Sequence, residues 1–67
     1  MAVIDDPDGY TNVRAGEGAD YDVVTRVVEG DVFYVIPQGG DQDWWPVRTT
    51  SGHSGFMHRS RIELVQN

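Results

Sequence analysis

Turn-forming residues interrupt this chain so often that its apolar stretches are all short: Gly, Pro, Asn and Asp recur along its whole length. No window of about 11 residues keeps the 3.6-residue spacing of apolar side chains that an amphipathic helix needs. The most strand-like stretch is VFYVI at 32–36, in which every residue is β-branched or aromatic. Short strands between frequent turns predict an all-β fold.

We expect five or six short strands, with a turn over DDPDG at 5–9, a hairpin turn over 51–55 and one 3₁₀ turn over 59–61 before the last strand. The apolar or alternating stretches that could supply these strands are 2–4, 10–16, 21–31 (which ends in a turn at 29–31), 32–36, 44–50, 56–58 and 62–65. A small closed or half-open barrel would cover the exposed edges of such a sheet. The predicted core is Val13, Val24, Val27, Phe33, Val35, Trp45, Val47, Met57 and Ile62, with Ile4 or Val65 closing one end.

The length of 67 residues predicts one domain over 1–67. A chain of this size buries only about 60% of its unfolded surface, so its core is small. Cys is absent, which rules out disulfides and Cys-ligated zinc but does not decide the compartment. The N-terminus MAVIDDPDG lacks the basic and long apolar regions of a signal peptide. The compartment therefore stays open, with an extracytoplasmic or cell-wall location favoured if the chain is part of a larger exported protein.

The charge balance is acidic: five Arg and no Lys stand against 11 Asp and Glu, a net charge of −6. Such a chain repels phosphate backbones and anionic lipid, so we expect neither nucleic acid nor a membrane as partner. No apolar run approaches the ~18 residues that a membrane span needs. A basic or amine-bearing partner is easier to accommodate, although the acids can equally serve solubility alone.

Five segments appear in an order and spacing that resemble the bacterial SH3-like (SH3b) domain family. They are DGYTNVRAG at 8–16, VVxxVxxGD at 23–31, DWWxVR at 43–48, GFMH at 55–58 and SRI at 60–62. The resemblance covers residues 8–65 and implies an SH3-like barrel. It also implies a non-catalytic binding module, because such domains hold hydrolases on peptidoglycan or make protein–protein contacts. Pro46, His58 and Arg61 depart from related patterns, and the last two argue against recognition of PxxP peptides.

Catalytic and metal sites find little support in the sequence. His53 lies beside Ser54, but a serine in a turn is expected for backbone reasons, and we predict no catalytic residue. Asp5, Asp6 and Asp8 could offer oxygens to calcium, yet the full spacing of a calcium loop is missing and a solvated Asx turn explains them. Two histidines without further ligands are a weak zinc signal. We therefore expect no metal and no cofactor.

The aromatic residues are more informative than the polar ones. By alternation, Trp45 and Val47 face inward while Trp44 and Pro46 face outward. The resemblance places Tyr10, Trp44 and Phe56 on a groove between the first long loop and the 37–43 loop. Acidic residues flank this groove, so it would suit a cationic extended ligand. The predicted ligand-binding residues are Tyr10, Trp44, Phe56, Tyr34, Asp20, Asp22, Asp41, Asp43 and His58.

Two functions remain open from the sequence. The first is a monomeric module that recognises peptidoglycan or its stem peptides through the aromatic groove and its acidic walls. The alternative is a protein–protein interaction module that binds a basic or extended peptide segment, through the same groove or an exposed strand edge.

Overall fold

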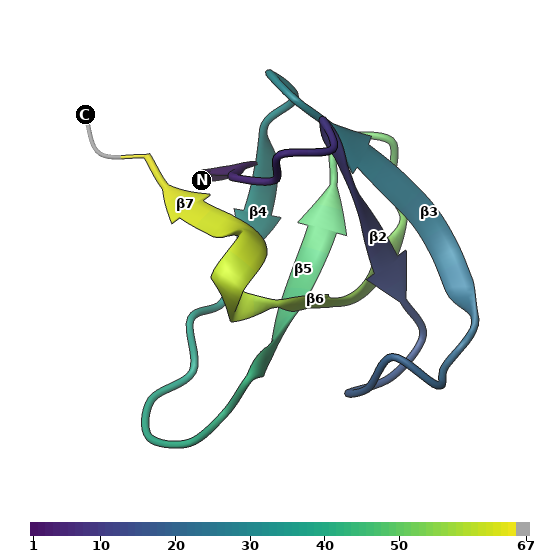
Figure 1. The fold of residues 1–67 in the computed structure, drawn as a ribbon, viewed down its shortest axis with the longest axis vertical. Coiled ribbons are helices and arrows are strands. Elements are labelled where there is room, and N and C mark those ends of the chain that lie inside the picture. The colour runs from purple at the N-terminus through teal and green to yellow at the C-terminus, as the bar shows by residue number, and fades with distance from the viewer. Residues whose placement is uncertain (66–67) are drawn as a thin grey trace.

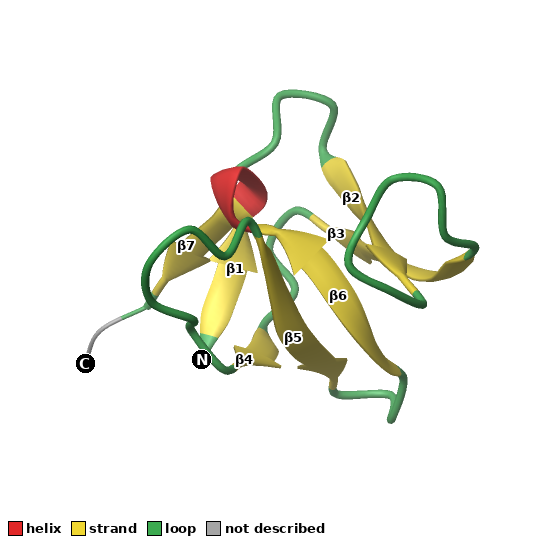
Figure 2. Ribbon diagram, turned by 90° about the horizontal axis from the view of Figure 1, so that it is seen from below, coloured by secondary structure: helices red, strands yellow, loops and turns green. Residues whose placement is uncertain are grey.

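The computed structural model describes residues 1–65 and consists of seven short strands and one 3₁₀ turn, with no α-helix in that range. The strands are β1 (Ala2–Ile4), β2 (Tyr10–Arg14), β3 (Val23–Val28), β4 (Phe33–Val35), β5 (Trp44–Thr49), β6 (Ser54–His58) and β7 (Ile62–Leu64), and the 3₁₀ turn η1 spans Arg59–Arg61. They form one antiparallel sheet in the order β3-β2-β6-β5-β4-β1-β7. The sheet curls into a half-barrel with β3 and β7 at its two edges (Figures 1 and 2). This confirms the predicted all-β SH3-like fold.

The predicted turns form for the expected reasons. In the 5–9 turn the Asp6 carboxylate accepts a hydrogen bond from the Asp8 amide at 2.9 Å, which is the predicted Asx turn. Gly9 closes the turn with a φ of 80°, a conformation that favours glycine. Residues 59–61 form the predicted 3₁₀ turn, and His58 caps it because its Nδ1 accepts a hydrogen bond from the Ser60 amide.

The core lies inside the curl of the sheet and consists of Ala2, Ile4, Val13, Val27, Phe33, Val47 and Met57, with Val35 and Ile62 packed against it. Most of the predicted core is confirmed, and Ile4 rather than Val65 closes the end of the barrel. Ala2 was not predicted, because an alanine at the N-terminus gives no strong apolar signal.

Two predicted core residues are placed differently. Val24 is exposed because the β2–β3 register shifts there: Val13 pairs with Thr25 and Arg14 with Val23, so Val24 is the extra residue of a bulge. Trp45 is only half-buried. It shares the inward face with Val47 and pairs with Met57, but it lies at the start of β5, where its indole N–H donates to the Gln42 carbonyl at 3.0 Å.

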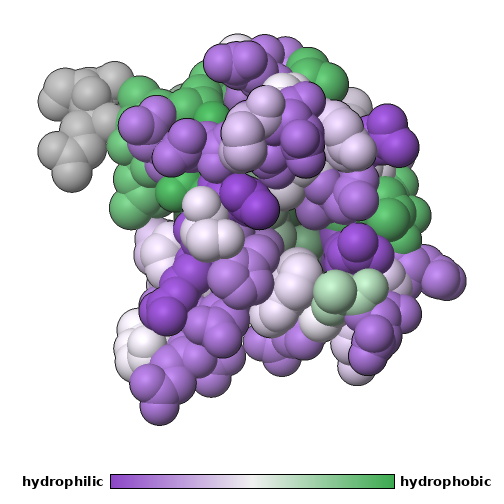
Figure 3. All heavy atoms as spheres, in the orientation of Figure 1, coloured by the Kyte–Doolittle hydropathy of each residue, from purple (hydrophilic) through white to green (hydrophobic). Residues whose placement is uncertain are grey.

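Apolar side chains also remain on the surface. Figure 3 shows them gathered over β7 and along β3, while most of the rest of this face is polar. The exposed apolar residues of these regions are Met1, Leu64 and Val65 near β7, and Val23, Val24 and Val28 on β3. No helix within residues 1–65 has the length and apolar character to cross a membrane.

Candidate functional site

The outward faces of β2, β5 and β6 carry the side chains that the sequence singled out. The register places Trp44 opposite His58, Pro46 opposite Phe56, and Phe56 in turn opposite Arg14 of β2. Successive residues of a strand alternate between faces, so these side chains share the convex side of the sheet. Two grooves flank this surface.

The first groove, here named the Trp44 groove, encloses about 260 Å³. Its lining comes from the 5–9 turn, β2, the 15–22 loop, β5, β6 and η1: Asp6, Thr11, Asn12, Arg14, Ala19, Trp44, His58 and Arg61. Trp44 and His58 form an aromatic wall, with ring centroids 5.2 Å apart and planes at 90°. This edge-to-face arrangement is one of the preferred geometries of aromatic pairs.

One residue that lines the Trp44 groove has a side-chain oxygen without a hydrogen-bond partner in the described part of the chain. The Asn12 Oδ1 atom is buried and receives no hydrogen bond from any residue in the described range 1–65. Buried polar atoms are nearly always paired, so an unpaired one calls for a partner. Asn12 is one of the residues that line the groove, but its Oδ1 has almost no accessible surface, so a ligand N–H can reach it only after the surrounding side chains shift.

The charged residues of the groove have both signs. Arg14 Nη1 donates to the Tyr21 carbonyl at 3.0 Å, which ties β2 to the 15–22 loop. Arg61 lies 3.7 Å from the Asp6 carboxylate. The pKa of Asp6 is held below its ordinary value of 3.8 by the hydrogen bond from the Asp8 amide, then by that from the Thr11 hydroxyl and by the charge of Arg61, while burial works against them. The groove is therefore a mixed-charge surface beside an aromatic wall.

The structure brings together only some of the predicted site residues. Trp44 and His58 share the Trp44 groove, whereas Tyr34 lines the second groove. Tyr10 and Phe56 line neither groove: the Arg26 guanidinium covers the Tyr10 ring at 4.6 Å, and Phe56 is half-buried between Pro46 and Arg14.

None of the four predicted acidic residues lines either groove. Asp20, Asp22 and Asp41 are exposed in the 15–22 and 36–43 loops, and only Ala19 of the first loop lines the groove. Asp43 forms an ion pair with Arg59 at 3.2 Å, so part of its charge is already compensated. Sequence reasoning missed Asp6, Thr11 and Arg61 as groove residues, because only the folded chain brings the 5–9 turn next to η1. Alternation with Tyr10 could have indicated Asn12.

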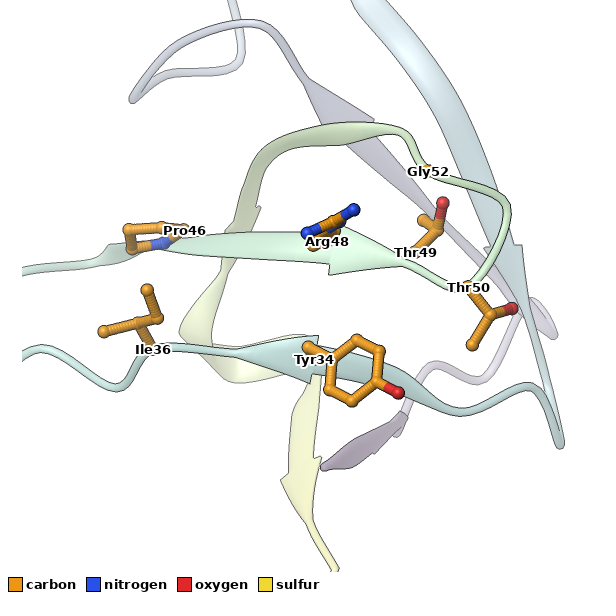
Figure 4. Close-up of a pocket in the computed structure, with 7 residues that line it drawn as sticks. All are labelled: Tyr34, Ile36, Pro46, Arg48, Thr49, Thr50 and Gly52. Atoms are coloured by element: carbon orange, nitrogen blue, oxygen red, sulfur yellow. The ribbon is translucent and has the colours of Figure 1, made fainter.

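The second groove, here named the Tyr34 groove, encloses about 560 Å³ on the outward face of β4 and β5. It is lined by Tyr34, Ile36, Pro46, Arg48, Thr49, Thr50 and Gly52 (Figure 4). Sequence reasoning named only Tyr34 of this set as a site residue, because the groove depends on how β4 pairs with β5.

Histidine and serine side chains form hydrogen bonds in two turns. His53 Nδ1 lies 3.0 Å from Ser51 Oγ, which in turn lies 2.9 Å from Thr49 Oγ1. His58 Nδ1 lies 2.8 Å from Ser60 Oγ. Both pairs are two residues apart along the chain and fasten the turns in which they lie. Among residues 1–65 no three His, Asp or Glu side chains cluster closely enough to hold a metal ion.

One comparison with known proteins identifies the family. The family model described as bacterial SH3 domain matches residues 9–63, which is most of the chain. Members of this family are generally binding modules. The matched range runs from Gly9, at the end of the first turn, to Glu63 in β7, and thus includes every strand that contributes to the two grooves. The chain belongs to the bacterial SH3 domain family.

Proposed function

We propose that this domain is a non-catalytic module that recognises peptidoglycan or its stem peptides through the Trp44 groove. The observation that carries the proposal is the aromatic wall of Trp44 and His58 in a groove that Asn12, with its unpaired Oδ1, also lines. An extended peptide lays its backbone N–H groups along such a groove, and one of them can donate to Asn12. Trp44 offers a large rigid contact area, as aromatic hot-spot residues do.

The charges of the groove support a stem peptide in particular. A stem peptide carries a free amine together with carboxylates, so it needs a site with both signs. The exposed Asp20, Asp22 and Asp41 of the 15–22 and 36–43 loops attract the amine, whereas Arg14 and Arg61, which line the groove together with Asp6, supply positive charge for the carboxylates. In this arrangement Tyr10 and Phe56 act beside the groove and not within it.

Retention on purified sacculi tests the proposal. We expect the wild-type chain to sediment with the sacculi and Trp44→Ala to lose most of this retention. The matched control is Val28→Ala, which truncates an exposed apolar side chain of β3 outside the groove. Circular dichroism of each variant verifies that it is folded. Absence of wild-type retention, or equal retention of Trp44→Ala, would overturn the proposal.

Asn12 offers a second and independent test. Asn12→Leu removes the acceptor with little change in side-chain volume, so it should weaken binding of a soluble stem peptide while a folded barrel remains. Acetylation of the peptide's free amine should weaken binding as well, because it removes the charge that the acidic loops attract. Unchanged affinity in both experiments would contradict the assigned binding mode.

The alternative is a protein–protein interaction module that binds a basic or extended segment of a partner. The exposed acidic loops favour it, since they would attract such a segment without any cell-wall component. Capture of one stoichiometric protein through the Trp44 groove, with no retention on sacculi, would select this alternative.

A further inference from the structure

The Tyr34 groove is separate from the Trp44 groove, and the two have no lining residue in common. Two pairs of residues that face each other across β4 and β5, here called the two levels of the Tyr34 groove, form most of its floor. Tyr34 pairs with Arg48, and the Ile36 amide donates to the Pro46 carbonyl at 3.0 Å. Figure 4 shows Ile36 and Pro46 at one end and Thr49, Thr50 and Gly52 at the other, with Tyr34 and Arg48 across from each other between them. The groove therefore has an apolar end and a polar end.

Arg48 differs from the other arginines of the described chain. Arg14 binds the Tyr21 carbonyl, Arg26 covers the Tyr10 ring, and Arg59 and Arg61 pair with Asp43 and Asp6. Within residues 1–65, Arg48 has no ion pair, side-chain hydrogen bond or ring contact of this kind. Its guanidinium is therefore available to a ligand.

The charge of this groove is opposite to that of the whole protein. The chain carries 11 acidic residues and a net charge of −6, yet no acidic residue lines the Tyr34 groove and its one charged lining residue is Arg48. Arginine binds carboxylates through two parallel hydrogen bonds, which gives it a preference for that group. The complementary group is a carboxylate.

The apolar end defines the rest of the ligand. Ile36 has 65% of its surface exposed and Tyr34 has 52%, so two large side chains face solvent on the two levels of the groove. Pro46 and Arg48 are two residues apart on one strand, which separates their side chains by about 6.6 Å. In an extended peptide, side chains at positions i and i+2 have the same separation.

We propose that the Tyr34 groove binds an extended segment of a partner protein that carries an apolar residue and, two residues away, an acidic residue. The apolar side chain packs on Ile36 and Pro46, and the carboxylate accepts hydrogen bonds from Arg48. The Tyr34 hydroxyl points toward the end of the groove at which Thr50 lies, so both hydroxyls can donate to the same carboxylate. This second surface would join a partner protein to whatever the Trp44 groove holds.

A titration followed by ¹⁵N–¹H NMR tests this site on the 67-residue chain. The probe is a blocked peptide of sequence acetyl-Ser-Leu-Thr-Glu-Ser-amide. We expect its addition to shift the amide signals of Tyr34, Ile36, Arg48 and Thr50 and to leave the Trp44 indole signal in place. Replacing Glu by Gln in the peptide should weaken binding about tenfold, because the opposite charge and one of the two acceptor oxygens for Arg48 are lost. Placing Leu and Glu next to each other should weaken it by a similar factor.

Two variants complete the test. Arg48→Gln should lose the difference between the Glu and Gln peptides, whereas Arg26→Gln, which removes an arginine that covers Tyr10 outside both grooves, should bind as the wild type does. No shift at millimolar peptide, equal binding of the Glu and Gln peptides, or shifts centred on Trp44 would each overturn the proposal. Shifts of the same amides on concentrating the free protein would show that a second copy occupies the groove, which would also overturn it.

Discussion

Trp44 stands edge-on to His58 across the β5–β6 pair, and the same His58 ring caps the 3₁₀ turn that follows. The Ser60 amide donates to His58 Nδ1 at 3.2 Å, so one imidazole supports both the aromatic wall of the Trp44 groove and the entry to η1. Arg61, at the end of η1, reaches back to Asp6. The shape of the groove thus depends on a local cap as well as on the sheet.

Substitution of His58 separates these two roles. His58→Ala should lower the free energy of unfolding by about 1–2 kcal/mol, because both the cap and the ring contact are lost. His58→Asn should recover about 1 kcal/mol, since its side-chain oxygen can accept from the Ser60 amide. Urea unfolding of the three proteins measures both values. Equal stability of the Ala and Asn variants would show that the cap contributes nothing.

The two adjacent tryptophans should differ in their effect on stability. Trp45 faces inward and donates to the Gln42 carbonyl, so we expect Trp45→Ala to cost about 3 kcal/mol, at the lower end for a core aromatic because the ring is half-buried. Trp44→Ala should cost about 1 kcal/mol, the value of one aromatic pair. Urea unfolding again provides the measurement. A larger loss for Trp44 than for Trp45 would mean that the inward side of β5 is misassigned.

Gly55 is the point at which β6 passes close to β2. A Cβ at this position would lie 2.5 Å from the Arg14 carbonyl oxygen and 2.7 Å from Val13 Cγ1. The backbone cannot yield as a flexible side chain can, so Gly55→Ala should destabilise the fold by about 1–3 kcal/mol. Gly39→Ala is the matched control, because a Cβ there meets nothing within 4 Å and the backbone has no positive φ. Thermal unfolding of both variants would contradict this assignment if their midpoints fell equally.

Asp6 should make stability depend on pH in the acid range. The pKa of Asp6 is lowered in the folded state, so its contribution to the free energy of unfolding is complete above the ordinary pKa of 3.8. This contribution is lost as the pH falls toward the lower pKa of the folded state. Asp6→Asn should therefore be less stable than the wild type at pH 7, and the difference should shrink as the pH drops below 3.8. The control is Asp8→Asn, which changes an exposed carboxylate in the same turn. Urea unfolding at several pH values measures the difference, and a constant gap would refute the role of Asp6.

Much of the fold could be predicted because it depends on local sequence patterns. Apolar alternation placed the inward faces of β2, β4 and β5, and turn residues predicted the 5–9 turn and a hairpin turn over 51–55, which in the structure ends earlier because β6 begins at Ser54. Val24 was the exception, because a bulge in β2–β3 breaks the alternation and nothing in the local sequence marks it. The site was less predictable. Alternation shows that Trp44 faces outward, but not which other outward side chains lie beside it.

The sequence by itself determined which side chains of β2, β4 and β5 point into the barrel and where the chain turns, since both follow from alternation along a strand and from the conformations that Gly, Pro and Asp favour. Tertiary structure decided the two grooves. The curl of the sheet brings Asp6, Asn12 and Arg61 to Trp44, and the β4–β5 register sets Ile36 against Pro46 and Tyr34 against Arg48. It also pairs Asp43 with Arg59 and leaves Arg48 without a partner among residues 1–65. These contacts join residues far apart in the chain, so they depend on sheet curvature and register, which local sequence does not encode.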